Sequence, residues 1–447
     1  MAVSNLENIR IMEKGFNLSQ AVSEADRCLL CVDAPCSKGC PADTDPGTFI
    51  RKLRLKNITG AVRTIKKNNI LGGACGVLCP TARLCEMECS ATGIGRVIEI
   101  GKIQRALIEH SWERGIKVLE QGKPREEKVA VVGSGPAGLS CAAELAKEGF
   151  QVTVFEARPE IGGVIRYGVP AYRFDKDFLK HELAEIEELG VTFKKNSAVG
   201  KGGAEKLLSE GFNAVFLSPG LWGAVKLKAD ATGIKGVYSS VDFLAAFREE
   251  RFDELGSALT GKRVAVIGGG SVAMDCAESA QKIGAVDVYL VYRRSFSQMP
   301  AEEAERIDVL GSGVHFLLLN QPLDFVTDNR KILTGLQLVR TRLGDKDESG
   351  RRRPVEIPGS EWLLDIDVVV EAIGNKAADD SPEWYPQVKV DPRKLIKVNP
   401  ETGETSMKGI FAGGDIVRGP GLVVEAVQDG KKAAAAIREY LHDVNSE

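Results

Sequence analysis

The pattern of hydrophobic and polar positions divides the chain near residue 125. Before this point, apolar residues recur at helical spacing over 49–53 and 61–65, with a break near Asn57, and a further helix is predicted over 100–115. Residues 1–27 are polar with a helical pattern, and the region has little β character. We therefore expect a small helical domain whose core is too small to be stable without a bound metal.

After a polar linker at 121–128, short apolar strands alternate with helices. Strands are predicted at 129–132 and 151–155, with a helix over 139–149 between them. The same order recurs with a strand at 263–267, a helix at 274–284 and a strand at 286–292. Near the C-terminus, a strand enters a turn over 408–415, and a long helix covers 425–441. This alternation predicts two Rossmann-like α/β units.

The first strand leads into the sequence G-S-G-P-A-G, which opens the helix. Glycine here lets backbone N–H groups approach a pyrophosphate at the helix N-terminus. An acid at the end of the next strand accepts hydrogen bonds from an adenosine ribose. The candidate ligands for this dinucleotide are Gly133, Gly135, Pro136, Ala137, Gly138 and Glu156.

The second unit carries the motif as G-G-G-S-V-A, with alanine replacing the last glycine, as the fingerprint allows. Its second strand ends in two arginines rather than an acid. Arginine at this place suits a 2′-phosphate and favours NADP(H) over NAD(H), unless one or both side chains are merely solvated. The candidate ligands are Gly268, Gly270, Ser271, Val272, Arg293 and Arg294. The run of arginines at 351–353, among Gly, Asp and Pro, is interpreted as a solvated loop.

The C-terminal turn is a third candidate site, formed by Gly414, Asp415 and Val424. An aspartate there can bond a ribityl or pyrophosphate oxygen. The N–H groups at the start of the following helix can stabilise negative charge on a reduced flavin. The alternative is a plain strand–turn–helix.

Eight of the ten cysteines lie between residues 28 and 89, in two groups of four that each contain a Cys-Pro pair. The run C-x2-C-x4-C-x3-C-P is close to the bacterial ferredoxin pattern, whose fourth cysteine ligates the other cluster. We therefore expect two interleaved clusters, and spacing alone makes Cys75 the eighth ligand. The alternative is a zinc-bound interaction module, but only one Cys-x2-Cys pair is present. Cys141 and Cys276, outside the groups, are expected to be small buried residues.

Composition and charge narrow the class of protein. The net charge of -3 gives no basic surface for nucleic acid. The N-terminus has no apolar signal region, and no stretch reaches the roughly 18 apolar residues of a membrane span, so we expect no membrane partner and a cytoplasmic location. In a reducing cytosol, clustered cysteines are metal ligands rather than disulfides. No Cys/His or Ser/His pairing supports nucleophilic hydrolysis.

Together these motifs resemble a known family over nearly all 447 residues. Two dinucleotide folds with a C-terminal G-G-D resemble the flavin-dependent pyridine-nucleotide disulfide oxidoreductases, although their Cys-x4-Cys redox pair is missing here. With the eight-cysteine domain, the chain resembles the glutamate synthase small-subunit-like flavoproteins, and among them the electron-entry part of dihydropyrimidine dehydrogenase. The motifs are CLLCVDAPCSKGCP, CGVLCP, GSGPAGL, GGVIRYGVPAYR, VIGGGSVAMD, YRRS and GGDI.

The resemblance implies a domain order and a set of cofactors. An N-terminal α-helical Fe–S domain (1–124) with two [4Fe–4S] clusters precedes two Rossmann-like domains. The second of these, for NAD(P)H (234–375), is inserted in the first, which binds FAD (125–233 and 376–447). Gly163 and Arg173 are similar to family residues beside the flavin, where Arg173 would stabilise anionic flavin unless it forms only a surface ion pair. One cluster takes Cys28, Cys31, Cys36 and Cys89, and the other takes Cys40, Cys79, Cys85 and Gln104, which leaves Cys75 as a spare.

The implied activity is that of an oxidoreductase subunit. Hydride passes from NAD(P)H to FAD, and single electrons pass through the clusters to a partner catalytic subunit with an FMN barrel. Gln104 and the cysteine segments favour uracil or thymine reduction to dihydropyrimidine as the partner's reaction, whereas YRRS is typical of glutamate synthase small subunits. The alternatives are the NADPH-dependent glutamate synthase small subunit, the flavin subunit of a bifurcating NADH-dependent ferredoxin:NADP oxidoreductase, or a diaphorase acting alone.

Overall fold

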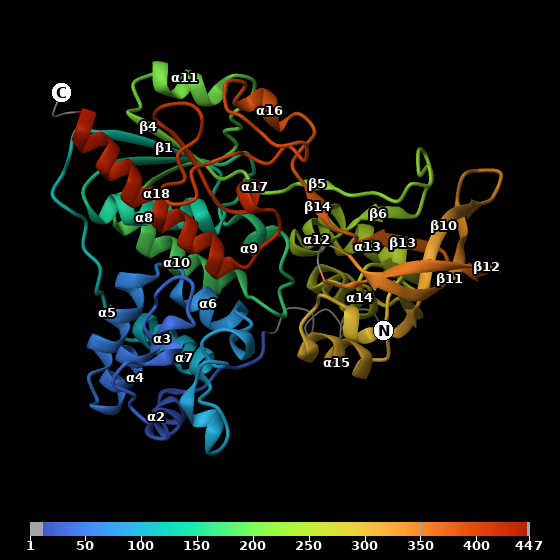
Figure 1. Ribbon diagram of the computed structural model, residues 1–447, viewed down its shortest axis with the longest axis horizontal. Helices are drawn as coiled ribbons and strands as arrows, with labels where there is room; N and C mark the ends of the chain where they lie inside the picture. The colour runs from blue at the N-terminus through green and yellow to red at the C-terminus, as the bar shows by residue number, and fades with distance from the viewer. Residues whose placement is uncertain (1–11, 348–349, 445–447) are drawn as a thin grey trace. The chain divides into compact units, whose positions relative to one another are not determined.

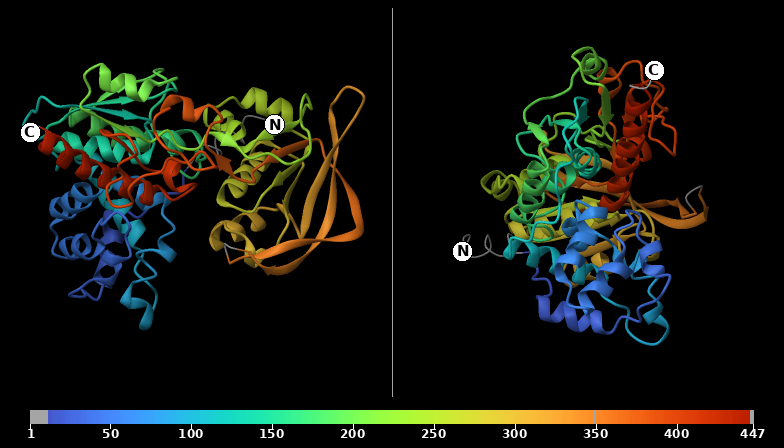
Figure 2. Two further views of the ribbon diagram at one scale, coloured as in Figure 1. Left: turned by 45° about the horizontal axis from the view of Figure 1, so that its top comes forward. Right: turned by 90° about the vertical axis from the view of Figure 1, so that its left-hand side faces the viewer.

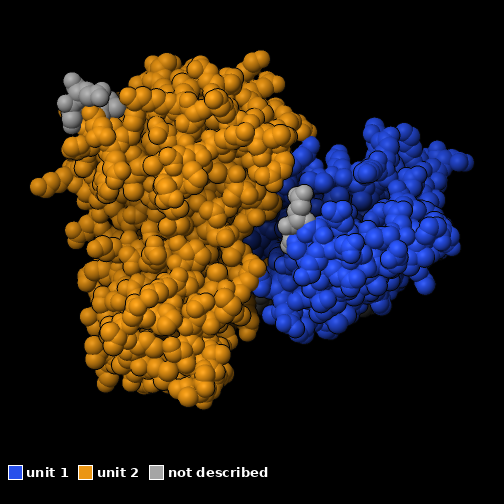
Figure 3. Space-filling view, in the orientation of Figure 1, with its two compact units in different colours: residues 1–11, 167–172, 222–376 blue, residues 12–166, 173–221, 377–447 orange. Residues whose placement is uncertain are grey.

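The computed structural model describes residues 12–347 and 350–444 (Figure 1). They fall into two compact units (Figure 3). The cysteine unit comprises 12–166, 173–221 and 377–444, and the inserted unit comprises 167–172 and 222–376. No helix in the described ranges is both long and apolar enough to cross a bilayer.

The N-terminal part of the cysteine unit is helical. Its helices bury apolar faces in one core that includes Phe49, Leu53, Ile65 and Leu107. The side chain of Asn57 caps a helix by accepting a hydrogen bond from the Gly60 N–H, which confirms the predicted break at this residue. The elements are α2 (Leu18–Asp26), α3 (Pro35–Lys38), α4 (Pro46–Arg54), α5 (Ile58–Asn68), α6 (Gly72–Leu78), η1 (Thr81–Arg83), η2 (Ser90–Gly93) and α7 (Ile100–Glu113).

The rest of the cysteine unit is built on a parallel sheet in the order β15-β4-β1-β2-β3. The last helix, drawn in red, packs against α8 (Figure 1). The strands are β1 (Lys128–Val132), β2 (Gln151–Phe155), β3 (Thr192–Lys194), β4 (Ala214–Leu217) and β15 (Ile410–Ala412). The helices are α8 (Pro136–Lys147), α9 (Gly163–Tyr167), α10 (Lys176–Glu188), α11 (Gly203–Ser209), α16 (Ser381–Trp384), α17 (Asp415–Arg418) and α18 (Val423–Val444).

The inserted unit contains a second parallel sheet, in the order β6-β13-β7-β8-β9. A three-stranded antiparallel sheet, β10-β11-β12, extends to one side of it (Figure 2). The strands are β5 (Gly223–Ala224), β6 (Val237–Ser239), β7 (Arg263–Ile267), β8 (Asp287–Tyr292), β9 (His315–Leu318), β10 (Asn320–Thr327), β11 (Leu333–Lys346), β12 (Arg352–Asp365), β13 (Val368–Glu371) and β14 (Asn375–Lys376). The helices are α12 (Ser240–Arg248), α13 (Phe252–Leu259), α14 (Ser271–Ile283), η3 (Phe296–Gln298) and α15 (Glu303–Gly311).

The structure confirms the predicted fold class. A helical N-terminal domain precedes two Rossmann-like parallel sheets, and the second sheet lies in sequence between β4 and β15 of the first. The predicted C-terminal strand is shorter than expected, since β15 ends at Ala412 and α17 begins at Asp415. Gly409 and Gly414, with φ of 82° and 75°, bound this short strand with turns.

Candidate cofactor sites

Four of the predicted cluster ligands line one pocket in the helical part, called the first cysteine pocket. They are Cys28, Cys31, Cys36 and Cys89, which come from the loop after α2, from α3 and from the start of η2. Burial and the nearby thiols, Cys89 foremost, raise the pKa of Cys36 to about 11. Two arginines of α4 fix the loop, because Arg51 donates to the Cys31 carbonyl (3.1 Å) and Arg54 to the Cys28 carbonyl (2.9 Å).

The other candidate ligands line a second cysteine pocket. Its wall contains Cys40, Cys75, Cys79, Cys85 and Gln104. The two sequence groups are thus divided between the pockets, as an interleaved arrangement requires: Cys89 faces the first and Cys40 faces the second.

The second pocket offers the polar environment that a thiolate-bound cluster needs. The Thr44 N–H donates to Cys40 Sγ at 3.4 Å, which is the kind of hydrogen bond that tunes cluster sulfurs. Gln104 is buried, and its Nε2 donates to the Gly72 carbonyl at 2.5 Å. That bond fixes the amide so that its oxygen remains as the donor atom for a metal. The donor set therefore fits a cluster.

Cys75 lies in α6, is buried, and lines the second pocket beside the other four candidates. A hydrogen bond with Cys75, together with burial, raises the pKa of Cys79. Both Cys75 and Gln104 are therefore close enough to be the fourth ligand of a cluster in the second pocket. The choice of Gln104 stays a prediction. Among residues 12–347 and 350–444, no three His, Cys, Asp or Glu side chains are grouped to hold a single metal ion.

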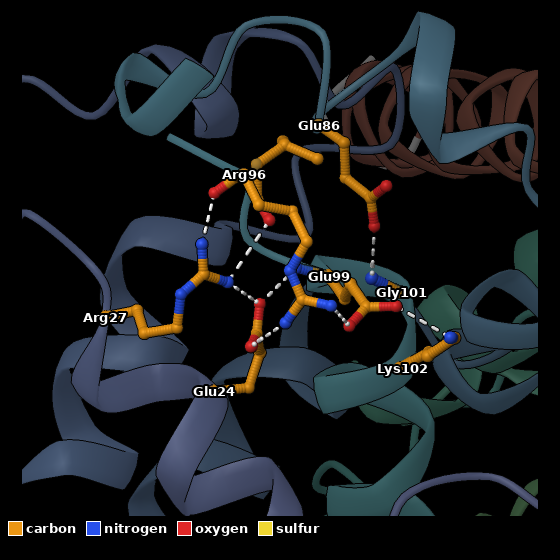
Figure 4. Close-up of polar contacts among 8 residues, drawn as sticks. Glu24, Arg27, Glu86, Arg96, Glu99, Gly101 and Lys102 are labelled. Carbon is orange, nitrogen blue, oxygen red and sulfur yellow. Dashed lines mark hydrogen bonds and ion pairs between the residues drawn. The ribbon is translucent and has the colours of Figure 1, made fainter. Parts of the chain in front are cut away.

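A polar network ties the segment before α7 to the end of α2, next to Cys28 (Figure 4). Glu24 is buried, and its carboxylate accepts hydrogen bonds from Arg27 (2.5 Å), Arg96 (3.1 Å) and the Glu99 N–H (3.0 Å). Arg27 also donates to the Arg96 carbonyl. Nearby, Glu86 accepts from the Gly101 N–H (3.2 Å), and Gly101 lines the second pocket. The network thus positions the chain around both pockets, and its charged residues were not among those that the sequence predicted to be functional.

The first glycine loop has the geometry of a dinucleotide cradle. Glu156, at the end of β2, accepts from the Ser134 N–H (3.1 Å) and hydroxyl (2.5 Å), which holds the loop in place. Gly163 has φ of 54°, and a Cβ there would lie 2.6 Å from the Gly135 Cα. Only glycine permits this approach. The structure therefore brings Gly163 against the G-S-G-P-A-G loop, as the predicted flavin site requires.

The C-terminal turn lies against the same loop. A Cβ at Gly414 would be 3.1 Å from the Ala137 Cβ, and the Gly414 N–H donates to Asp429 at 2.9 Å. Burial raises the pKa of Asp415 from 3.8 to about 6, although a hydrogen bond from the Gly421 N–H favours the charged form. Val424, predicted at the flavin, lies in the wall of the second cysteine pocket. Val424 belongs to α18, which also packs against α8, the helix that follows the first glycine loop.

Arg173, the predicted catalytic residue, precedes α10 and is half-buried. Asp175 caps that helix by accepting from the Asp177 N–H (2.6 Å). The role of Arg173 beside a flavin stays a prediction.

Cys141 and Cys276 are buried as expected, and burial raises the pKa of both thiols.

The second glycine loop lies between β7 and α14, and Gly270, Ser271 and Val272 lead into the helix. Arg293 is exposed at the end of β8, whereas Arg294 is buried. Arg294 forms an ion pair with Asp347 (2.7 Å). The structure thus separates the two arginines that the sequence treats as equivalent.

A helical domain with cysteine pockets, followed by two glycine-loop sheets, defines an NAD(P)H-dependent FAD and iron–sulfur oxidoreductase. The chain belongs to the pyridine nucleotide-disulphide oxidoreductase family, whose model matches residues 103–215 and 127–430. The model of dihydropyrimidine dehydrogenase domain II, 4Fe-4S cluster, matches residues 5–116.

Three relatives show the range of functions that similar chains have. The NADP(+)-dependent formate dehydrogenase subunit beta of Moorella thermoacetica is 38% identical over 92% of this chain, which spans only 60% of that relative. The glutamate synthase [NADPH] small chain of Escherichia coli is 35% identical, with 99% of this chain and 95% of the relative covered. The NAD-dependent dihydropyrimidine dehydrogenase subunit PreT of Salmonella typhimurium is 34% identical, with 97% of each covered.

Solved structures confirm the fold. FprA of Mycobacterium tuberculosis, in complex with NADPH, has a TM-score of 0.61 and 22% identity over 72% of this chain and 86% of its own. Thioredoxin reductase of T. acidophilum has a TM-score of 0.51 and 20% identity over 71% of this chain and 100% of its own. At these identities the likeness concerns the fold alone.

Proposed function

We propose that the chain is the electron-entry subunit of a heteromeric oxidoreductase that oxidises NADPH and reduces a pyrimidine on a partner subunit. The relatives with similar length are described as a small chain and a subunit, which supports a partnered role. The observation that carries the proposal is the pair of cysteine pockets in the same compact unit as the G-S-G-P-A-G sheet. Electron acceptors and a flavin-type site would then lie within one compact unit.

Each cofactor would be held by residues already described. When bound, FAD takes up a hydride from the nicotinamide and the clusters carry single electrons, so the chemistry belongs to the cofactors. Residues 125–233 and 376–447 would hold FAD through the first glycine loop, Glu156 and Asp415. Residues 234–375 would hold NADP(H) through the second loop. The protein's own task is to orient these groups and to exclude water from them.

Two [4Fe–4S] clusters would lie within residues 1–124, one in each cysteine pocket. We assign the four cysteines of the first pocket to one cluster. We assign Cys40, Cys79, Cys85 and Gln104 to the other, because the Gln104 amide is already oriented by Gly72. Anaerobically purified protein should then be brown, with about eight irons per chain. Colourless protein that contains zinc instead would defeat the assignment.

The identity of the partner is tested by affinity purification of the tagged chain from its native cell. An FMN-containing partner that reduces uracil or thymine supports the proposal. A glutaminase-bearing partner supports the second candidate, the small chain of glutamate synthase, which is favoured by the YRRS segment and by 35% identity along almost the whole chain. Turnover with dyes and no stable partner would contradict both.

A further inference from the structure

Arg294 is fastened to the hairpin formed by β11 and β12, within the inserted unit. Its Nη2 donates to Asp347 Oδ2 at 2.7 Å, and its Nε donates to the Arg352 carbonyl at 2.8 Å. The side chain is only 6% exposed. A guanidinium that is buried and bonded on two sides serves as an anchor.

The base of the hairpin tip is held by further bonds. The Asp347 N–H donates to the Arg351 carbonyl (2.7 Å), and the Arg351 N–H donates back to Asp347 Oδ1 (3.2 Å). The Arg352 N–H donates to Gln298 Oε1 at 2.8 Å. The hairpin is therefore bonded both to the end of β8 and to η3, and the backbone of Arg351 has a defined place.

The segments that hold the hairpin also contact the second glycine loop. A Cβ at Gly269 would lie 2.6 Å from the Tyr292 ring, so the residue before Arg293 packs against the loop. The Ala301 N–H donates to the Gly269 carbonyl at 3.1 Å, which brings the segment after η3 to the loop as well. In this fold, the end of the second strand faces the adenosine ribose.

Three arginines, Arg293, Arg294 and Arg351, are near enough to influence one another at the end of β8. Partial burial, followed by the positive charges of Arg294 and Arg351, lowers the pKa of Arg293, whose side chain is still exposed. The Asp347 carboxylate pairs with the Arg294 guanidinium and accepts from the Arg351 N–H, so it joins the hairpin to the end of β8. Neighbouring positive charges favour the binding of an anion between them.

We propose that Arg351, from the hairpin, binds the 2′-phosphate of NADP(H) together with Arg293, and that Arg294 is a positioning residue that fixes the hairpin. The inference rests on the proposed use of NADP(H). It replaces the interpretation of Arg351 as part of a solvated loop, and it changes the role of Arg294 from direct ligand to anchor. The bidentate guanidinium suits a phosphate dianion.

The test is calorimetric titration of the cofactor-loaded protein with 2′,5′-ADP and with 5′-AMP, which differ in the 2′-phosphate alone. We expect Arg351→Gln to weaken 2′,5′-ADP binding at least about tenfold, the effect of one lost charged hydrogen bond, and to leave 5′-AMP binding unchanged. Arg330→Gln, at an exposed arginine in the β10–β11 turn of the same unit, is the matched control and should alter neither.

Asp347→Asn separates anchoring from direct binding by Arg294. If Arg294 is an anchor, loss of its ion pair loosens the hairpin, and 2′,5′-ADP binds more weakly although a negative charge has been removed. Unchanged or tighter binding would show Arg294 to be a ligand and would overturn the positioning role.

Binding by the unsubstituted protein separates a failure of the proposed NADP(H) preference from a failure of the role proposed for Arg351. If it binds 5′-AMP as tightly as 2′,5′-ADP, the proposed NADP(H) preference itself fails. If it prefers 2′,5′-ADP and Arg351→Gln retains that preference, NADP(H) use stands and the role of Arg351 is wrong.

Discussion

At the scale of single residues, Gln104 offers the sharpest test of the cluster assignment. We expect Gln104→Leu to remove the second cluster and keep the first, because leucine has no donor atom and the first pocket lies elsewhere. Iron content should fall from about eight to about four per chain, with one set of paramagnetic signals lost on reduction. Cys75→Ser is the control and should keep both clusters. If the two variants behave in the opposite way, Cys75 is the ligand.

Asp415 should give the FAD-free protein a measurable pH dependence. Its pKa is raised from 3.8 to about 6 by burial, so its contribution to stability is fully present below pH 3.8 and is lost as the pH rises through 6. The loss amounts to as much as about 3 kcal/mol. Asp415→Asn should therefore flatten the fall in unfolding free energy between about pH 4 and pH 6, the window set by the two pKa values. Asp443→Asn, at an exposed carboxylate, should leave the slope unchanged.

At the scale of elements, a buried charge cluster joins three helices of the cysteine unit. Lys66 of α5 contacts Glu185 (2.6 Å) and Glu182 (3.4 Å) of α10, and the side chains of Lys66 and Glu182 are 0% exposed. Glu182 also accepts from the Gly73 and Ala74 N–H groups at the start of α6, the helix of Cys75. Burial opposes the charge of Lys66, but the two carboxylates outweigh it and raise its pKa.

Lys66→Met should therefore destabilise the unit by about 3–5 kcal/mol, because it leaves the buried Glu182 carboxylate and the partly buried Glu185 carboxylate without their cation. Urea unfolding, followed by loss of cluster absorbance and by circular dichroism, measures the change. Lys67→Met, at the exposed neighbour on the same helix, should cost less than about 0.5 kcal/mol. Equal effects in the two variants would show that the buried cluster contributes nothing specific.

These two lysines also show how far the sequence could predict the structure. Local patterns identified the helix break at Asn57, both glycine loops and the class of the fold, because each depends on neighbours in sequence. Lys66 and Lys67 look alike in the chain, and only packing against α10 decides which one is buried. Arg293 and Arg294 differ for the same reason, since the partner of Arg294 lies 53 residues away.

At the scale of the whole molecule, the two ends of the cysteine unit meet. Lys431 of α18 donates to the Ala42 carbonyl at 2.6 Å across 389 residues of sequence, and Ala42 follows the Cys40-Pro41 pair. Val424 of the same helix lines the second cysteine pocket. The helix that completes the FAD-type domain thus also completes the pocket, so the clusters and the flavin site would be stabilised together. Spacing in the sequence gives no signal for this contact.

Lys431 should consequently influence one cluster and spare the other. It is partly buried, and burial lowers its pKa, while the nearby Cys40 is among the groups that favour its charge. Cluster potentials depend on local charge and solvent exposure, so Lys431→Met should move the midpoint potential of the second cluster to a more negative value. Lys432→Met, at the exposed next residue, is the matched control. Redox titration followed by electron paramagnetic resonance resolves the two signals, and an equal shift of both in Lys431→Met would show that the lysine acts on overall structure rather than on the second pocket.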